Sequence, residues 1–296
     1  MSVFSDFDWS WRGVRVRETG AEIRFSRGLI LDVWRGGLYI IAEALRPKAA
    51  RLSGLSFAQI KPRPWYLIWG ALRQGGLRHE AEGSVVLHFS DQTVTDQLSL
   101  DDSLHINGAC TDISKSHVAK TFEAIFGYDL ATDPETASGP YLEKGEENGV
   151  HDATIETRPK PAAAGRVYQR LIDNRTQGGT VLDYRCPTVF GEIPLVFLKE
   201  RPIDQRFANL NTRVRITTAD TCFSNEEIEQ ISTFCAAMGL DWGGLDILRD
   251  AADGRLYIVD VNKTDMGPPL ALPLKEKLSA VKTLGLALRD GVESRL

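Results

Sequence analysis

The segment DILRDAADGRLYIVDVN, residues 246–262, restricts the fold more than any other part of the chain. Two alternating apolar stretches flank the Asp-Gly pair at 253–254, which favours the turn of a β-hairpin. Folding back at this turn sets Asp246 across from Asp260, and Asn262 shares a strand face with Asp260 at a spacing of about 7 Å. The hairpin therefore predicts three oxygen-bearing side chains at one end of a two-stranded platform.

The chemistry of these three side chains has two interpretations. Strand alternation places residues 256 and 258 on the face that carries Asp260. Hard cations such as Mg²⁺ bind one or two carboxylates together with substrate phosphates. Without a cation, two neighbouring carboxylates repel each other, and the pKa of one rises. The pattern alone leaves open a metal site, or an Asp260 that caps the strand end before a turn that begins at Asn262.

Composition narrows the class of protein. With 296 residues, the chain can bury a sizeable core and form two or three sub-domains. General phosphate-backbone binders are basic, whereas this chain has a net charge of −5, so we expect no nucleic-acid partner. The most apolar stretch, residues 28–45, contains Asp32, Arg35 and Glu43. It is too short and too charged to span a membrane, so we expect no membrane partner.

Cysteine usage and the N-terminus indicate the compartment. The cysteines form no CxxC pair, and their spacing fits no zinc site, so we expect buried or half-buried free thiols in a reducing compartment. The N-terminal MSVFSDFDWSWRG has early acids and lacks the apolar segment of a signal peptide. We therefore expect a cytoplasmic protein. The cysteines are Cys110, Cys186, Cys222 and Cys235.

Strand and helix patterns alternate along the rest of the chain and favour an α+β fold with antiparallel sheets. Residues 13–43 alternate and are predicted to be rich in strand. Ser224 and Glu227 form a capping box, which predicts that a helix begins there and ends at Gly239. The other expected elements are a turn at 61–64, a short helix at 65–76, a buried strand at 84–90, a helix at 114–127, two strands around a loop at 139–159, a strand at 166–173, a hairpin at 180–202 with Gly191 in its turn, and a last helix near 273–290.

The segments GLDWGGLDILRD and DGRLYIVDVN, residues 239–250 and 253–262, together resemble the C-terminal signature of ATP-grasp enzymes. The resemblance implies that Asp246, Asp260 and Asn262 bind the Mg²⁺ ions, with Mn²⁺ as an alternative, that bridge the phosphates of ATP. Position 260 is Asp where the family usually has Glu.

Two more segments extend the resemblance upstream. RFANLNTRVRI, residues 206–216, resembles a segment of the ribosomal-protein glutamate ligases and their relatives. This implies that Arg206, Asn209 and Arg213 face the phosphates or an acyl phosphate. VYQRLIDN, residues 167–174, looks like the strand whose backbone binds adenine. The resemblance assigns this role to Gln169, Arg170, Leu171 and Ile172.

Charged side chains complete the implied nucleotide site. Asp183 matches the acid that accepts hydrogen bonds from the ribose hydroxyls. Lys144 corresponds to a strand-end lysine before a glycine-containing loop, residues 145–149, whose backbone amides can hold phosphate oxygens. Lys115 resembles a lysine that opens the first ATP-grasp sub-domain, and Lys120 is the alternative for that role. The cations expected to neutralise the triphosphate are Lys199, Arg201 and Arg206.

The resemblance covers residues 106–270 and implies an ATP-grasp fold, in which two α+β lobes grip ATP. The implied domains are an N-terminal domain at 1–105, a small lobe at 106–173, and a C-terminal lobe with the metal site at 174–296. The loop at 263–268 corresponds to one that usually faces the acceptor substrate. Many such enzymes are dimers or tetramers, so a homodimer is one expected state.

No group of side chains predicts a protein nucleophile. The five histidines are scattered, and neither GxSxG nor GxxxxGK[ST] occurs. This agrees with the reaction that the resemblance implies, in which a substrate carboxylate attacks the γ-phosphate of ATP and an amine, or less often a thiol, displaces phosphate from the acylphosphate. The substrates would be a small-molecule or peptide carboxylate and an amine, and the products would include ADP and phosphate. Two alternatives stay open: a small-molecule kinase on this fold, and a non-catalytic nucleotide-binding protein.

Overall fold

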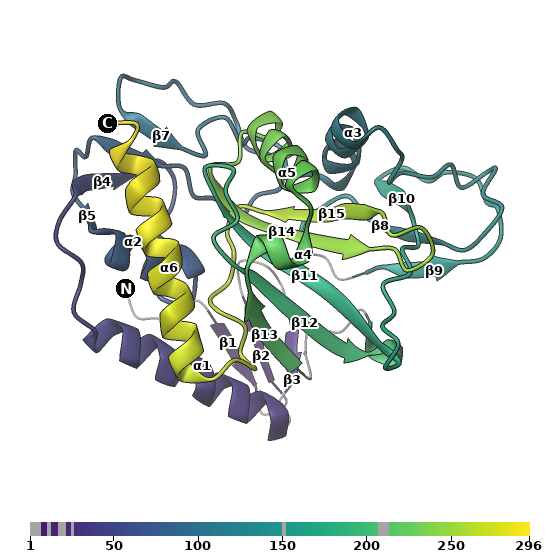
Figure 1. Ribbon diagram of the computed structural model, residues 1–296, viewed down its shortest axis with the longest axis horizontal. Coiled ribbons are helices and arrows are strands. Elements are labelled where there is room, and N and C mark those ends of the chain that lie inside the picture. The colour runs from purple at the N-terminus through teal and green to yellow at the C-terminus, as the bar shows by residue number, and fades with distance from the viewer. Residues whose placement is uncertain (1–6, 11–12, 17–21, 25–26, 150–151, 207–212) are drawn as a thin grey trace. The chain divides into compact units, whose positions relative to one another are not determined.

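The computed structural model of the chain describes residues 7–10, 13–16, 22–24, 27–149, 152–206 and 213–296 (Figure 1). Asn209, one of the predicted catalytic residues, lies outside the described residues. The chain divides into two compact units, Met1–Arg46 and Pro47–Leu296. Helices and strands are mixed along the chain, and the strands form several sheets. The expectation of an α+β fold is therefore confirmed.

The described residues of the first unit form a three-stranded antiparallel sheet and one helix. The expectation of strands throughout 13–43 is wrong beyond residue 26, because a helix occupies residues 27–45. Tyr39 and Glu43 are both buried. Their spacing of four residues places both side chains on one face of a helix. The elements are β1 (Phe7–Ser10), β2 (Gly13–Val16), β3 (Glu22–Arg24) and α1 (Arg27–Leu45).

The second unit begins with a four-stranded sheet in the order β5-β4-β6-β7. Its strands pair in parallel, so the expectation of antiparallel sheets is wrong here. The reason is that a helix connects β4 to β5 and a long loop connects β6 to β7, and such crossovers return the chain in the same direction. The elements are β4 (Ser53–Phe57), α2 (Leu67–Gly75), β5 (Leu77–His79), β6 (Val85–Leu87) and β7 (Leu104–Ile106).

The predicted last helix is confirmed as α6, Leu274–Glu293, which packs along α2 (Figure 1). A Cβ atom on Gly285 would lie 2.6 Å from the Cβ of Gln74 and 2.9 Å from the carbonyl oxygen of Ala71. The close approach of the two helices therefore requires glycine at this position. No helix in the described part of the chain is long and apolar enough to cross a membrane.

A small antiparallel sheet, in the order β10-β8-β9, carries the predicted adenine strand and the lysine before the loop. The predicted helix beside it is confirmed: it begins after Ser114, whose side chain accepts a hydrogen bond from the backbone of His117, and Gly127 ends it in the left-handed conformation. The elements are α3 (Lys115–Phe126), β8 (Tyr141–Gly145), β9 (Thr154–Glu156) and β10 (Arg166–Arg170).

The largest sheet has five antiparallel strands in the order β13-β12-β11-β14-β15. The predicted capping box of Ser224 and Glu227 is present, and Gly191 in the β11–β12 turn has the positive φ that favours glycine. Helices α3 and α5 contact each other, and α3 packs on β15. The elements are β11 (Thr180–Val189), β12 (Val196–Pro202), η2 (Ile203–Gln205), β13 (Arg213–Thr217), α4 (Ala219–Cys222), α5 (Asn225–Ala237), β14 (Trp242–Arg249) and β15 (Leu256–Asn262).

The hairpin of β14 and β15 is confirmed, with Asp246 opposite Asp260. The prediction that Ile258 and Asp260 share a face of the strand is wrong. The register shifts between Asp246 and Ile247, and Ile247 lies opposite Ile258. Val259 is therefore an extra residue in β15, a β-bulge. As a result, Asp260 faces away from the side of the sheet that carries Ile258.

Candidate functional site

The register of the five-stranded sheet gathers several of the predicted charged residues on one face, together with Arg185. Arg185 in β11 lies opposite Asp246 in β14, which lies opposite Asp260 in β15. Residues directly opposite each other share a face, as do residues two apart on a regular strand. We call this set of side chains the charged row: Asp183, Arg185, Lys199, Arg201, Asp246, Asp260 and Asn262.

Asp246 is the ionised centre of the charged row. Arg185 Nη1 lies 2.9 Å from Asp246 Oδ2, and Lys199 Nζ lies 3.7 Å from Asp246 Oδ1. Burial raises the pKa of Asp246, but Arg185 and Lys199 lower it by more, so the pKa falls from 3.8 to about 2. At neutral pH this side chain is a carboxylate.

Asp260 has fewer partners. Its Oδ1 atom is buried and has no hydrogen-bond partner among the described residues. Burial and the neighbouring charge of Asp246 raise the pKa of Asp260, and Lys144 opposes them. Lys144 Nζ lies 3.4 Å from the carbonyl oxygen of Val259. Burial lowers the pKa of Lys144 to about 8, against the effect of Asp260.

The donor atoms of Asp246 and Asp260 fit a hard divalent cation. Asp246 Oδ1 is also buried and accepts no hydrogen bond from the described residues, although Lys199 Nζ faces it at 3.7 Å. Asn262 Oδ1 accepts hydrogen bonds from Thr264 N at 2.9 Å and from Thr264 Oγ1 at 3.2 Å, which fixes the turn after the strand. In the described part of the chain, no group of three His, Cys, Asp or Glu side chains could hold a metal ion. Two carboxylates would leave the other ligand positions to phosphate oxygens and water.

The predicted adenine segment is partly buried and has one unsatisfied side chain. Gln169 and Lys144 share a face of the small sheet, because Gln169 pairs with Leu142. Within the described residues, the buried Gln169 Nε2 atom has no hydrogen-bond acceptor. Arg170 points its guanidinium to Asp250, at 3.4 Å. Leu171 is half-buried and Ile172 is buried.

The side chain of Arg206 contacts the predicted adenine segment and not Asp246 or Asp260. Its Nη2 atom donates to the carbonyl oxygen of Ile172 at 2.8 Å and to Asn174 Oδ1 at 3.1 Å. Asn174 also donates to Asp183 Oδ1 at 2.7 Å, and Arg201 pairs with the other oxygen of Asp183. The predicted ribose acid is thus already fixed in orientation by two neighbours.

Arg213 is not brought to the charged row. It is exposed and lies opposite Glu200, the neighbour of Lys199 in β12. Adjacent residues of a strand point to opposite faces, so Arg213 lies on the other side of the sheet from Lys199. A role that needs contact with Asp246 or Asp260 is inconsistent with this position.

The predicted phosphate loop is held against the start of α3. Lys115 Nζ donates to the carbonyl oxygen of Glu147, and the side chain of Glu146 accepts hydrogen bonds from the backbone and side chain of Ser116. A carboxylate is stabilised at a helix N-terminus, where backbone N–H groups are unpaired. Glu146 thus occupies donors that would otherwise be open to an anion.

Sequence reasoning missed Arg185 and Asp265 as members of the site. Arg185 Nη2 donates to Asp265 Oδ1, and both side chains are largely buried. One signal could have found Arg185, because it lies two residues after Asp183 and shares its strand face. Asp265 lies in the loop at 263–268, which the resemblance relates to the acceptor substrate, but its contact with Arg185 appears only in the tertiary structure.

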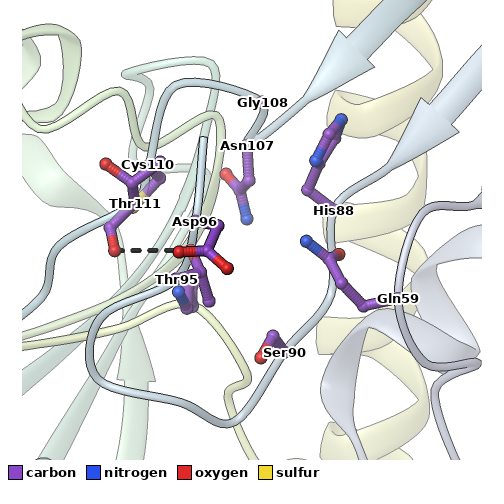
Figure 2. Close-up of a pocket in the computed structure, with 10 residues that line it drawn as sticks. Gln59, His88, Ser90, Thr95, Asp96, Asn107, Gly108, Cys110 and Thr111 are labelled. Atoms are coloured by element: carbon purple, nitrogen blue, oxygen red, sulfur yellow. Dashed lines mark hydrogen bonds between the residues drawn. The ribbon is translucent and has the colours of Figure 1, made fainter. Parts of the chain in front are cut away.

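A separate pocket lies where the turn after β15 meets the four-stranded sheet and its loops (Figure 2). His88 Nε2 lies 2.8 Å from His105 Nδ1, and His105 Nε2 lies 3.0 Å from Asp101 Oδ1. The buried Lys263 also lines this pocket, and no hydrogen bond or ion pair joins its ammonium group to another of the described residues. The lining residues are Gln59, His88, Ser90, Thr95, Asp96, Asn107, Gly108, Cys110, Thr111 and Lys263.

All four cysteines are free, as expected, and three are buried, with Cys222 half-buried. Burial raises the pKa of the Cys110 and Cys235 thiols to about 12. Neither thiol is therefore a nucleophile at neutral pH.

Comparison with known proteins gives structural matches only. No protein-family model matches the chain, and no curated protein matches its sequence. The chain is similar to the ATP-grasp ligase PsnB complexed with minimal precursor, at 18% identity and a TM-score of 0.42, over 60% of this chain and 64% of PsnB. The match therefore spans less than two-thirds of the length of PsnB.

Two other solved structures match a larger share of the chain. The macrocyclase MdnC from Microcystis aeruginosa, bound with precursor peptide MdnA, is similar at 11% identity and a TM-score of 0.48, over 80% of this chain and 99% of MdnC. D-alanine–D-alanine ligase from Bacillus anthracis, complexed with ATP, is similar at 12% identity and a TM-score of 0.49, over 82% of this chain and 97% of that enzyme.

Proposed function

We propose that this protein is an ATP- and Mg²⁺-dependent ligase of the ATP-grasp type, which joins a carboxylate to an amine or thiol and releases ADP and phosphate. One observation carries the proposal. Asp246 and Asp260 lie opposite each other on neighbouring strands, and each has a buried oxygen with no hydrogen-bond partner among the described residues. A buried polar atom without a partner costs free energy, so a retained pair of this kind indicates a ligand.

The residues around the two acids have complementary roles in this proposal. Asp246, Asp260 and Asn262 would hold Mg²⁺, which when bound stabilises negative charge on phosphoryl oxygens. Lys144 and Lys199 attract the phosphates of the nucleotide as point charges. These groups position reactants and neutralise charge, which is the main contribution of protein side chains to phosphoryl transfer.

The nucleoside part would lie between the small sheet and the charged row. Gln169 offers an unsatisfied amide group, and the backbone of Leu171 and Ile172 follows it. Asp183 is oriented by Arg201 and Asn174 and accepts hydrogen bonds from ribose hydroxyls. The substrates to be joined would be small molecules or peptides that carry a carboxylate and an amine.

A specific observation favours a second candidate, a nucleotide-binding protein that does not catalyse ligation. Two arginines that the resemblance assigns to the phosphates or an acyl phosphate, Arg206 and Arg213, lie away from Asp246 and Asp260. Glu146 also occupies donors at the start of α3. Such a protein would bind Mg-ATP without turnover.

Calorimetric titration of Mg-ATP and Mg-ADP tests the site. We expect Mg²⁺-dependent binding by the wild type, and a loss on the order of tenfold or more in Asp260→Asn, because the substitution removes a charged ligand while preserving shape. Asp253→Asn is the matched control, since Asp253 lies at the turn of the same hairpin. A wild type that binds no nucleotide, or an Asp260→Asn variant that binds as tightly as wild type, contradicts the proposal.

An ADP-release assay separates the two candidates. A ligase releases ADP and phosphate only when a matching carboxylate and amine are both present. A protein that binds Mg-ATP but releases no ADP across a broad panel of carboxylate and amine pairs supports the non-catalytic candidate.

A further inference from the structure

Arg185 occupies the middle of the charged row. It lies opposite Asp246, and its Nη1 atom is 2.9 Å from Asp246 Oδ2. Lys199 Nζ is 3.7 Å from the other oxygen, Oδ1. Both oxygens of the central carboxylate therefore already face a cation that belongs to the chain itself.

Asp265 holds Arg185 in this position. Its Oδ1 atom accepts a hydrogen bond from Arg185 Nη2, and only 11% of the Arg185 side chain and 8% of the Asp265 side chain are exposed. Gly244 completes the packing, because a Cβ atom there would lie 3.0 Å from Arg185 Cζ and even closer to Asp265. A guanidinium held from two sides in a packed environment keeps its charge beside Asp246.

The charges around the two metal-binding candidates are not in balance. The carboxylates of Asp246, Asp260 and Asp265 interact with five cations of the described residues, namely Lys115, Lys144, Arg185, Lys199 and Arg201. Arg201 also pairs with Asp183, so five cations face four acids. A divalent cation that enters alone adds two positive charges to this group, in a partly buried region where charges interact more strongly than in water. A polyphosphate brings the opposite charge.

We propose that Arg185, positioned by Asp265, is an internal counter-ion of Asp246 that excludes free divalent cations and makes metal binding depend on a bound polyphosphate. This inference rests on the proposed function, because it takes Asp246 and Asp260 as metal ligands. Phosphate oxygens give the guanidinium and ammonium groups a second anion to contact, which releases the oxygens of Asp246. The order of binding is thus built into the sheet register.

The test measures Mn²⁺ affinity by electron paramagnetic resonance, first without nucleotide and then with a non-hydrolysable ATP analogue. The main variant is Arg185→Met with Asp265→Asn, since removal of both charges avoids leaving a buried ion unpaired. The double variant leaves the net charge of the group unchanged but removes the cation that lies 2.9 Å from Asp246 Oδ2. We therefore expect it to bind Mn²⁺ alone more tightly than wild type, on the order of tenfold or more. The difference shrinks when the analogue is present.

Two further variants guard against indirect effects. Arg185→Lys keeps the charge, and we expect it to bind Mn²⁺ alone as weakly as wild type. Arg215→Met is the matched control, because Arg215 pairs with Glu200 on the opposite face of the same sheet. A tenfold gain in either of these variants would assign the effect to loosened packing and overturn the inference.

The outcomes separate this inference from the proposed function. Equal Mn²⁺ affinity in wild type and the double variant, or no Mn²⁺ binding by the double variant, overturns the role of Arg185. The same series includes Mg-ATP binding by wild type. If wild type binds Mg-ATP and the double variant shows no gain, only the counter-ion role fails; if wild type binds neither Mg-ATP nor Mn²⁺ with the analogue, the proposed function fails.

Discussion

The two faces of β14 are both largely buried, but they are filled in opposite ways. On one face, Leu245 and Ile247 pack with Cys186, Ile258 and Val261, and all five side chains are fully buried. On the other face, Asp246 lies between Arg185 and Asp260. The first face is satisfied by packing alone. The second face has charges of both signs and two buried carboxylate oxygens that accept no hydrogen bond from the described residues.

The difference shows where this sheet contributes stability and where it contributes chemistry. Apolar side chains that fill a core contribute stability roughly in proportion to the area they bury. Charged groups in a buried row contribute little net stability, because desolvation offsets their attraction. The two faces should therefore respond differently to substitution, with large losses of stability on one and losses of binding on the other.

The largest expected effect is on the apolar face. Ile247→Ala should lower the free energy of unfolding by about 2–5 kcal/mol, because it removes buried methylene groups and leaves a cavity. Urea denaturation measures the change. The control Ile155→Ala, at an exposed position in β9, should change the free energy of unfolding by no more than about 0.5 kcal/mol. Similar losses in both variants would contradict the comparison.

The next effect concerns how the free energy of unfolding depends on pH through the charged face. The pKa of Asp246 falls from 3.8 to about 2 on folding. Between these values the unfolded chain binds more protons, so the stabilisation is present above pH 3.8 and is lost as pH falls toward 2. Wild type should lose about 2 kcal/mol more than Asp246→Asn across this window, in urea titrations at stepped pH. The same slope in both proteins would show that Arg185 and Lys199 do not hold the carboxylate ionised.

A smaller loss of stability is expected at Gly244, where the charged face leaves no room for a side chain. Gly244→Ala should lower the free energy of unfolding by about 1–2 kcal/mol, because the added methyl group meets Arg185 and Asp265. Thermal unfolding measures the loss. Gly139→Ala is the control, since a Cβ atom there meets nothing within 4 Å. An unchanged midpoint in Gly244→Ala would mean that Arg185 is not held tightly in place.

The smallest effect tests which basic residues belong to the charged row. Lys199→Gln should weaken Mg-ATP binding by about 1 kcal/mol, or roughly fivefold, because it removes a cation near Asp246. Arg213→Gln, on the opposite face, should change the affinity less than about twofold. Competition with a fluorescent nucleotide measures both. A larger loss in Arg213→Gln would favour the role that the sequence assigned to it.

Local signals in the sequence were sufficient for most single elements. The capping box at Ser224, the turn at Gly191 and the hairpin that sets Asp246 opposite Asp260 are all present. Each depends on residues close together in the chain, so propensity and turn chemistry determine it. For this reason, the sequence alone predicts that Asp246 lies opposite Asp260.

Signals that depend on context were less reliable. Alternation near the N-terminus predicted strand, yet residues 27–45 form a helix, in which the buried Tyr39 and Glu43 are four residues apart and so lie on one face. Strands β4, β5, β6 and β7 pair in parallel because long connections join them, and no short sequence pattern predicts this pairing. A single bulge at Val259 turned Asp260 away from Ile258.

The sequence by itself determined the hairpin with its two acids, because the turn and both strands lie within residues 246–262. Only the tertiary structure decided that Arg185 lies beside Asp246, that Asp265 holds it, and that Arg213 faces the other way. These positions depend on the register between strands that are distant in the chain. Register is selected by the packing of the whole sheet, and a one-residue shift would move each side chain to the opposite face.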